Sequence, residues 1–353
     1  MDDFSNNERV LGIVGGTDYV TVQDLTIRNS SGRGIVNGGS HNRVLDTTIT
    51  HTRNAGLLTT NWSAAATDNE YVGNDISDTV AGNDCHVASD PCAVTGGWES
   101  AVNVYEEGPG AAGHNLYENN RIHDNDGEGM TLMDYDVVRS NTVYDNFGVE
   151  IYLDRKQHDV VERNLLYESE TNYLPIGQNQ SYRLLARGIV FADEFAPART
   201  SGNIIRNNMM INLRAGIHFW NAISGSGLID NLIENNTIVN SWDYGISFDP
   251  SSSTTGTVLR NNLVVPRRGS ITRGVTGVNG VDVAANLFVL PGDSGDPHLP
   301  GEGTFSFDPN AYKLRPNASY AVDKGVATPA TKDFFGGPRS HGSGYDIGAD
   351  EFG

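Results

Sequence analysis

Carboxylates are the most frequent residues of this chain that could do acid–base chemistry. Acidic side chains occur in pairs at Glu106, Asp134 and Asp193, and Glu150 stands within an apolar segment. Glycosidases use two carboxyl groups, about 5–5.5 Å apart to retain the anomeric configuration and about 6.5–9.5 Å apart to invert it. These four carboxylates are therefore candidates for a hydrolytic pair, and the alternative for any one pair is an ordinary acidic surface.

A second set of candidates lies in one segment, residues 149–156. It contains the catalytic candidates Glu150, Asp154, Arg155 and Lys156 beside Tyr152. The cations could bind an acidic substrate, and Glu150 is the residue we would substitute first. The alternative interpretation is a solvated charged turn.

The turn at residues 123–128 offers oxygen ligands at alternate positions, Asp124, Asp126 and Glu128, which suits calcium. It departs from the twelve-residue helix–loop–helix pattern. His123, His158 and His218 share no metal-ligand spacing, so we expect no transition-metal site.

A short strand-like sequence motif, here called the β-type phrase, recurs ten times, and the structure that it forms must position these residues. In eight of the ten phrases an Asn stands two places before an apolar residue, and most intervals between the apolar residues are 21 to 28. The apolar residues are Ile27, Ile49, Ile76, Ile122, Val143, Leu166, Met210, Ile238, Val264 and Phe288. A fixed period of this size indicates stacked units that cannot bury their apolar faces alone.

The repeating unit is predicted to be made of strands, because its residues are β-branched or alternate in polarity between Asn, Asp, Gly and Ser. Stacked Asn side chains can hydrogen-bond from coil to coil, and Asn tolerates a left-handed backbone, so we expect an Asn ladder at a bend. A second strand follows each bend and opens with a small residue, as at Gly129 and Gly216. Two strands and two bends per coil would account for the residue count.

With phrases such as 118–122 and 234–238, the chain resembles the secreted right-handed parallel β-helix proteins of the pectate-lyase-like superfamily. The resemblance implies an all-β, single-domain right-handed parallel β-helix (β-solenoid) of about ten coils over residues 1–290. The tail motifs at 319–325, 333–336 and 346–351 look like the ending of bacterial members, so residues 291–353 are expected to be a C-terminal cap.

Two intervals are about one coil too long, Ile76 to Ile122 and Leu166 to Met210. We interpret the excess as inserted loops near 78–100 and 168–187, which are rich in Pro and Gly. Both enter at the same phase of the coil. They would wall a trough floored by strands at 129–133 and 149–153, on the order of 10 to 15 Å wide, because coils stack about 4.8 Å apart.

Strand alternation predicts which side chains face outward over this trough. One row is Asn103, Thr131, Glu150, Val190, His218 and Ser247, and the next is Tyr105, Met133, Tyr152, Ala192, Trp220 and Asp249. We expect Tyr105, Tyr152, Trp220 and Asn103 to bind substrate, since aromatic rings can stack on the apolar faces of sugars. The alternative is that the rings pack beneath the inserted loops.

Composition limits the partners. With 44 acidic and 24 basic residues the net charge is −20, which disfavours nucleic acid and anionic membranes. The sequence has no apolar stretch that would insert into a membrane and no signal peptide, so it could be a mature or trimmed form. A disulfide between Cys85 and Cys92 would fit a secreted or extracellular location, and two free thiols are the alternative.

The leading hypothesis is a secreted polysaccharide-processing enzyme, a lyase acting by β-elimination on a uronate-containing polysaccharide. The resemblance implies this chemistry, since lyases of the superfamily neutralise the uronate carboxylate, often with calcium, and transfer protons through Lys, Arg, His or Tyr. It predicts that Lys156, Arg155 or His218 is essential. The alternatives are a glycoside hydrolase with paired carboxylates and a non-catalytic carbohydrate-binding or surface protein.

Overall fold

The computed structural model describes residues 8–62, 64–82, 99–105, 113–169, 186–250, 253–267, 275–304 and 306–353. The chain divides into two compact units. The first unit contains Met1–Lys156 and Asn172–Ala186, and the second contains Gln157–Thr171 and Arg187–Gly353. The inserted loops near 78–100 and 168–187, and with them Cys85 and Cys92, lie almost wholly outside the described residues.

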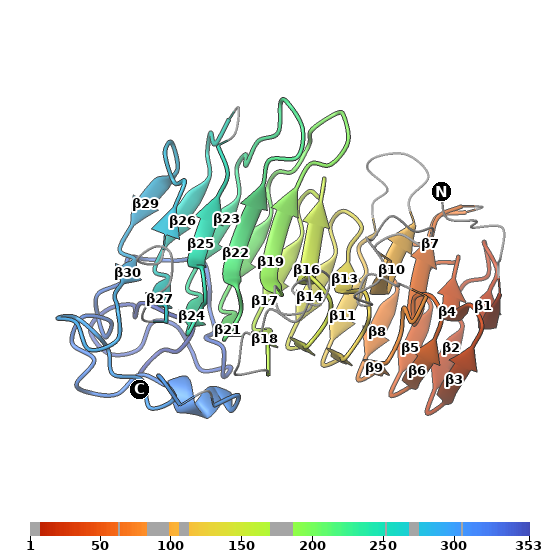
Figure 1. Cartoon of the computed structure of the whole chain (residues 1–353), viewed down its shortest axis with the longest axis horizontal. Helices are drawn as coiled ribbons and strands as arrows, with labels where there is room; N and C mark the ends of the chain where they lie inside the picture. The colour runs from red at the N-terminus through yellow and green to blue at the C-terminus, as the bar shows by residue number, and fades with distance from the viewer. Residues whose placement is uncertain are drawn as a thin grey trace, which may run out of the picture. The chain divides into compact units, whose positions relative to one another are not determined.

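The first unit is a stack of parallel coils with three sheets (Figure 1). Its first sheet contains β1 (Arg9–Ile13), β4 (Arg33–Asn37), β7 (Leu57–Thr60), β10 (Ser100–Tyr105), β13 (Glu128–Thr131) and β16 (Val149–Asp154). Its second sheet contains β2 (Thr21–Gln23), β5 (Arg43–Leu45), β8 (Glu70–Val72), β11 (Leu116–Glu118) and β14 (Val137–Arg139). Its third sheet contains β3 (Thr26–Ser30), β6 (Thr48–Thr52), β9 (Asp75–Ser77), β12 (Arg121–His123) and β15 (Thr142–Tyr144).

The second unit repeats the same three-sheet plan. Its first sheet contains β19 (Arg187–Ala192), β22 (Ala215–Trp220), β25 (Tyr244–Phe248) and β28 (Val275–Thr276). Its second sheet contains β17 (Val160–Glu162), β20 (Ile204–Arg206), β23 (Leu232–Glu234), β26 (Val258–Arg260) and β29 (Asp282–Ala284). Its third sheet contains β18 (Leu165–Tyr167), β21 (Met209–Ile211), β24 (Thr237–Val239), β27 (Leu263–Val265) and β30 (Leu287–Phe288).

The all-β solenoid is confirmed, but each coil has three strands where two were expected. The recurring phrase is itself bent, because the residue before each recurring Asn has a left-handed backbone, as in Asn119 (φ 56°) and Ser140 (φ 57°). This residue divides the phrase into two short strands, such as β11 and β12. The expectation that the recurring Asn itself takes the left-handed conformation is therefore wrong by one position.

The Asn ladder is confirmed in both units. Asn74 Nδ2 donates to Asn120 Oδ1 at 2.9 Å, and Asn120 Nδ2 donates to Asn141 Oδ1 at 2.9 Å. The backbone N–H groups of Asn74 and Asn120 donate to the same oxygens. In the second unit the ladder runs through Asn164, Asn208, Asn236, Asn262 and Asn286. These buried amides satisfy the backbone groups at a bend where no sheet hydrogen bond is available.

The other two corners of the first unit carry ladders of their own. One joins Asn42, Asn69 and Asn115 and ends on Asp136. The other joins Thr79, Asn125 and Asn146 and ends on Glu150. Both therefore finish on a carboxyl group.

Stacked apolar residues fill the interior of each coil. In the first sheet of the first unit Ile35, Leu57, Met130 and Ile151 are all at most 1% exposed. The residue before the first three of these is glycine, because a side chain there would point into the corner: a Cβ on Gly34 would lie 2.4 Å from the Gly56 carbonyl oxygen. Close packing thus requires the small residue at this position in those three strands, and Glu150 replaces it before Ile151.

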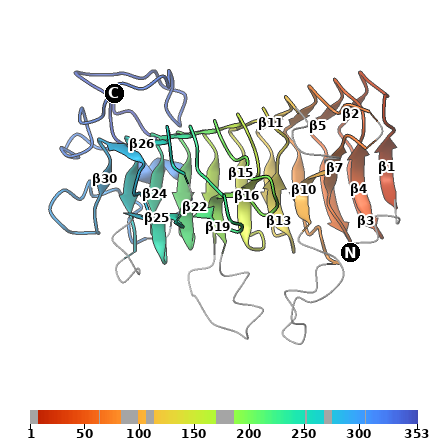
Figure 2. The same ribbon diagram turned by 90° about the horizontal axis from the view of Figure 1, so that it is seen from above.

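In the second unit the tail covers the third sheet. Tyr312, Leu314 and Ile347 belong to the same apolar cluster as Met209 and Val239. The tail contains the short 3-10 helix η2 (Pro309–Tyr312), which Figure 1 shows below the strands of this unit. Figure 2 shows β19, β22 and β25 of the first sheet side by side. Arg339, buried in the tail, donates from Nη1 to Glu351 Oε2 at 2.7 Å and from Nε to Asn207 Oδ1 at 3.1 Å. The role of residues 291–353 as a cap stays a prediction. In the part of the chain described, no helix has the length and apolarity needed to cross a membrane.

Candidate functional site

The strand register of the first sheet corrects the predicted outward rows. Thr131 pairs with Tyr152, and Met130 pairs with Ile151. Tyr152 therefore continues the row of Asn103 and Thr131, and Glu150 pairs with Gly129 instead. The predicted rows align Gly148 with Gly129, and this alignment displaces β16 by two residues from its observed register with β13.

Glu150 does not lie on the outer face, contrary to our prediction. It occupies the corner position that is Gly or Ala at the four preceding strands of this sheet, β4, β7, β10 and β13, and it is 0% exposed. Its Oε2 accepts from Asn146 Nδ2 at 2.6 Å. Burial raises the pKa of Glu150 well above its usual range. Glu150 therefore stands at the end of an Asn ladder, where it supplies the acceptor that a further Asn would provide.

The neighbouring carboxylates are also internal. Asp134 is 2% exposed, and Asp136 is 0% exposed. Asp136 accepts from the backbone N–H groups of Asn115 and Met133, both at 2.8 Å, and burial raises its pKa to about 8. Asp134 is thus poorly placed to contact a polymer, contrary to our prediction, because it packs inside the turn after β13.

The charged residues at the end of β16 differ in how far they are buried. Lys156 is 7% exposed, and its charge lowers the pKa of Asp136 against the larger effect of burial. Asp154 and Arg155 are half-buried, and Arg155 takes a left-handed backbone at φ 57°. Lys156 is therefore not on the exposed surface that we expected, since it lies near a buried acid. Glu106 lies outside the described residues.

Two aromatic rings meet on the outer side of the first sheet in the first unit. The ring centroids of Trp62 and Tyr105 are 5.1 Å apart, with the planes tilted by 40°. Trp62 is 47% exposed. Asn103, half-buried on the same strand as Tyr105, accepts a hydrogen bond from Thr131 Oγ1 at 3.1 Å. Tyr152 is 7% exposed, so among the predicted binding residues of this unit Tyr105 and Asn103 reach solvent and Tyr152 does not.

In the second unit the predicted His218 and Trp220 lie on β22 with outward orientation. His218 is half-buried, and Trp220, two residues along the same face, is 44% exposed. His218 Nδ1 lies 3.1 Å from the carbonyl oxygen of Ser247 on β25. Burial, followed by the charge of Arg187, lowers the pKa of His218 to about 4. The neutral imidazole must donate from Nδ1 to that carbonyl, which leaves Nε2 with its lone pair.

Asp193, the other carboxylate proposed for this unit, has a structural role. It is 0% exposed and accepts from the backbone N–H of Arg199 at 2.9 Å and of Thr200 at 3.1 Å. Thr200 Oγ1 donates to the same oxygen at 3.0 Å. This buried acid holds the turn after β19, so it does not form an exposed pair.

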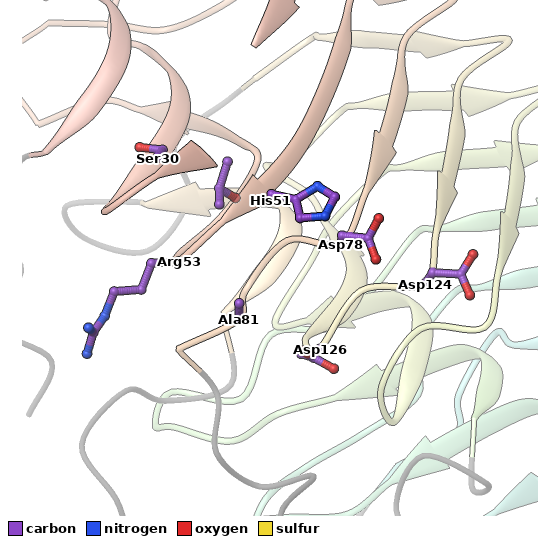
Figure 3. A pocket seen from close by; sticks show the side chains of 8 residues that line it. Ser30, His51, Arg53, Asp78, Ala81, Asp124 and Asp126 are labelled. Atoms are coloured by element: carbon purple, nitrogen blue, oxygen red, sulfur yellow. The ribbon is translucent and has the colours of Figure 1, made fainter. Parts of the chain in front are cut away.

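A polar pocket of about 560 Å³ opens at the third corner of the first unit (Figure 3). His51, Asp78 and Asp124 come from three successive coils, and each has a left-handed backbone. His51 lies within β6, and Asp78 and Asp124 directly follow β9 and β12. Ser30, Thr52, Arg53, Ala81 and Asp126 complete the lining. Figure 3 shows Arg53 extending away from Asp78 and Asp124.

Hydrogen bonds connect this pocket to its surroundings. Thr50 Oγ1 lies 2.8 Å from His51 Nδ1 and donates to Asp78 Oδ2 at 3.4 Å. On the next coil Asp124 Oδ2 lies 2.6 Å from His123 Nδ1. The Asp78 backbone N–H donates to the Asp124 carbonyl oxygen at 3.2 Å, so the two carboxylates are one coil apart.

Two of the three predicted calcium ligands line this pocket, and the third does not. Asp124 and Asp126 are lining residues, whereas Glu128 is 6% exposed and accepts from Ser100 Oγ at 3.2 Å. Within the described ranges, no group of three or more His, Cys, Asp or Glu side chains is arranged to hold a metal ion.

Sequence reasoning missed His51, Asp78 and Trp62. A usable signal was present for the first two, since each stands two places after a recurring apolar residue, as Asp124 does. For Trp62 no periodic signal exists, because it follows the end of β7 and meets Tyr105 only through the stacking of coils.

Comparisons with known proteins gave two family models and a solved structure. A family model described as "Right handed beta helix region" matches residues 80–233, and one described as "Periplasmic copper-binding protein (NosD)" matches residues 189–290. Among solved structures, a crystal structure of pectate lyase Pel9A is similar, with 17% sequence identity and a TM-score of 0.49 over 93% of this chain and 70% of that chain. No curated protein matches the sequence.

The residues in the second matched range do not fit a copper site. Copper favours imidazole, thiolate and thioether ligands. Residues 189–290 contain one histidine, His218, and no cysteine. Their two methionines, Met209 and Met210, are 0% exposed within the apolar core.

Proposed function

Because the chain is a right-handed parallel β-helix protein, we propose that it is a polysaccharide lyase that acts by β-elimination on a uronate-containing polymer. The proposed site is the outer face of β19, β22 and β25. The observation that carries the proposal is His218, a neutral imidazole with a hydrogen-bonded Nδ1, next to an exposed Trp220. A protein with this activity would act outside the cytoplasm, because uronate-containing polymers occur there.

The chemistry needs a base at the carbon next to the uronate carboxylate. His218 Nε2 would take the C5 proton, and the C–H electrons would form the C4–C5 double bond. The C4–O bond would break with its electron pair on the oxygen of the leaving sugar, which would take a proton from water. Arg187, whose charge already acts on His218, would neutralise the carboxylate and so acidify that proton. Trp220 would hold the sugar ring by stacking.

The test is the activity of His218→Asn on polygalacturonate and alginate, each with calcium or with chelator. General bases contribute about 10²–10⁴ to rate, so kcat/KM should fall by at least about 100-fold. Ultraviolet absorbance of the unsaturated product and new reducing ends should rise together in the parent protein. His298→Asn is the matched control, because it makes the same substitution at an exposed histidine of the tail, outside the proposed site. Full activity in His218→Asn would refute the proposal.

Glycoside hydrolysis is a second candidate because of the pocket at the third corner. Asp78 and Asp124 stand one coil apart, about 4.8 Å along the stack, close to the separation used by retaining glycosidases. Reducing ends that rise without ultraviolet absorbance, and that Asp78→Asn and Asp124→Asn each abolish, would favour this function over elimination.

A further inference from the structure

The contact between Trp62 and Tyr105 is held in place by the backbone on both sides. Tyr105 pairs with Thr60 across β7 and β10, and the Asn61 N–H donates to the Tyr105 carbonyl oxygen at 3.3 Å. The Trp62 N–H donates to Thr60 Oγ1 at 3.2 Å. The two rings are therefore preorganised, and a ligand would not have to order them.

The exposure of the pair argues against a purely structural role. A tryptophan that served only to complete the core would be buried, whereas Trp62 is 47% exposed while its neighbours Thr59 and Thr60 are 0% and 8% exposed. The indole Nε1 has no hydrogen-bond partner among the residues that the structure describes. Apolar ring faces with a polar donor at one edge suit a ligand that is itself apolar on one face and hydroxylated at its rim.

Polar groups beside the rings supply further donors. Asn103 lies two residues before Tyr105 on the same outer face, roughly 7 Å away along the strand. Its Oδ1 accepts from Thr131 Oγ1, which orients the amide, and its Nδ2 makes one long contact of 3.4 Å to Glu99 Oε1. The amide carries two hydrogens, so one remains directed elsewhere.

We infer that Trp62, Tyr105 and Asn103 form a glycan-binding platform that takes a pyranose ring of a polysaccharide, distinct from the residues assigned to elimination. Trp62 and Tyr105 would stack on the C–H face of the sugar, and Asn103 would donate to a ring hydroxyl. The inference rests on the proposed function only for the class of ligand. It assigns the first unit a binding role that requires no catalytic group.

The test uses the full chain with His218→Ala, so that the polymer is not degraded, and affinity gel electrophoresis in polygalacturonate, alginate and xylan. Trp62→Ala and Tyr105→Ala should each raise the dissociation constant by on the order of tenfold or more. Trp62→Phe and Tyr105→Phe keep a ring and should stay within about threefold of the parent. Tyr19→Ala is the control, since Tyr19 is an exposed ring stacked on His41 in the same unit.

Failure of this inference can be told from failure of the lyase proposal. Retardation that is unchanged by Trp62→Ala, or absent in all three polymers for the parent, would overturn the platform. Unsaturated product from the chain with native His218 would leave the lyase proposal standing in that case. Conversely, Trp62-dependent retardation without product from any polymer would support the platform and remove the lyase.

Discussion

Substitution of Asp136 by Asn should change stability with opposite sign at low and high pH. Burial raises the pKa of Asp136 from 3.8 to about 8, so the folded chain holds a proton that the unfolded chain releases. The free energy of unfolding should therefore fall as pH rises from about 4 to 8. At pH 7, roughly 3 units above the unfolded value, the cost is on the order of 4 kcal/mol at about 1.4 kcal/mol per unit.

Asparagine removes this cost but loses one acceptor. Its Oδ1 can still accept from the Asn115 N–H, while its Nδ2 would face the Met133 N–H, which now donates to the second carboxyl oxygen at 2.8 Å. An unmet buried donor costs about 1–3 kcal/mol. Asp136→Asn should thus be less stable than the parent by about that amount at pH 4 and more stable by about 1–3 kcal/mol at pH 7.

Urea unfolding followed by circular dichroism at pH 4, 5.5, 7 and 8.5 measures the difference. Other titrating groups cancel, because they are common to both proteins. Asp24→Asn, on an exposed left-handed residue of the same unit, is the control for replacing an aspartate that is not buried. A constant offset between Asp136→Asn and the parent across the four pH values would refute the argument that Asp136 is protonated in the fold.

Three further predictions follow from other parts of the structure. Because burial and Arg187 lower the pKa of His218 to about 4, initial rates should give a kcat/KM profile whose acid limb lies near pH 4; a limb near 6.5 would mean that His218 is not the base. Arg339→Ala should reduce the free energy of unfolding of the second unit by about 3–5 kcal/mol, because Glu351 would stay buried without its partner, and urea unfolding with little change would contradict this. Asn120→Ala removes hydrogen bonds to both neighbouring coils and should cost roughly 3 kcal/mol or more, whereas Asn119→Ala on the exposed side of the bend should cost about 1–2 kcal/mol by calorimetry.

Periodicity predicted the solenoid and its Asn ladder because both depend on contacts that repeat with the coil. Asn74, Asn120 and Asn141 could be identified as a stack from spacing alone. The number of strands per coil could not, since one left-handed residue such as Asn119 bends the phrase without interrupting its apolar pattern. Bends that depend on a single backbone conformation leave little trace in residue type.

Candidate site residues were harder to predict than the fold. His218 and Trp220 followed from alternation within one regular strand. The position of Glu150 could not be predicted in this way. Gly129 can be aligned in sequence with either Gly148 or Glu150, and these two alignments differ by two residues. Burial of Asp134 and Lys156 depends on neighbouring turns, which alternation within a strand does not describe.

The Asn ladders have a polarity. At each step the earlier amide donates to the oxygen of the later one, as from Asn74 to Asn120 and on to Asn141, so the side-chain dipoles align along the stack. Each column has an acceptor end and a donor end, comparable to the two ends of a helix. Asp136 and Glu150 stand at the donor ends of two columns, where each supplies the acceptor oxygen that the last step requires. Whole coils could then be added or removed between two Asn residues, provided that an acceptor remains for the last donor of the column.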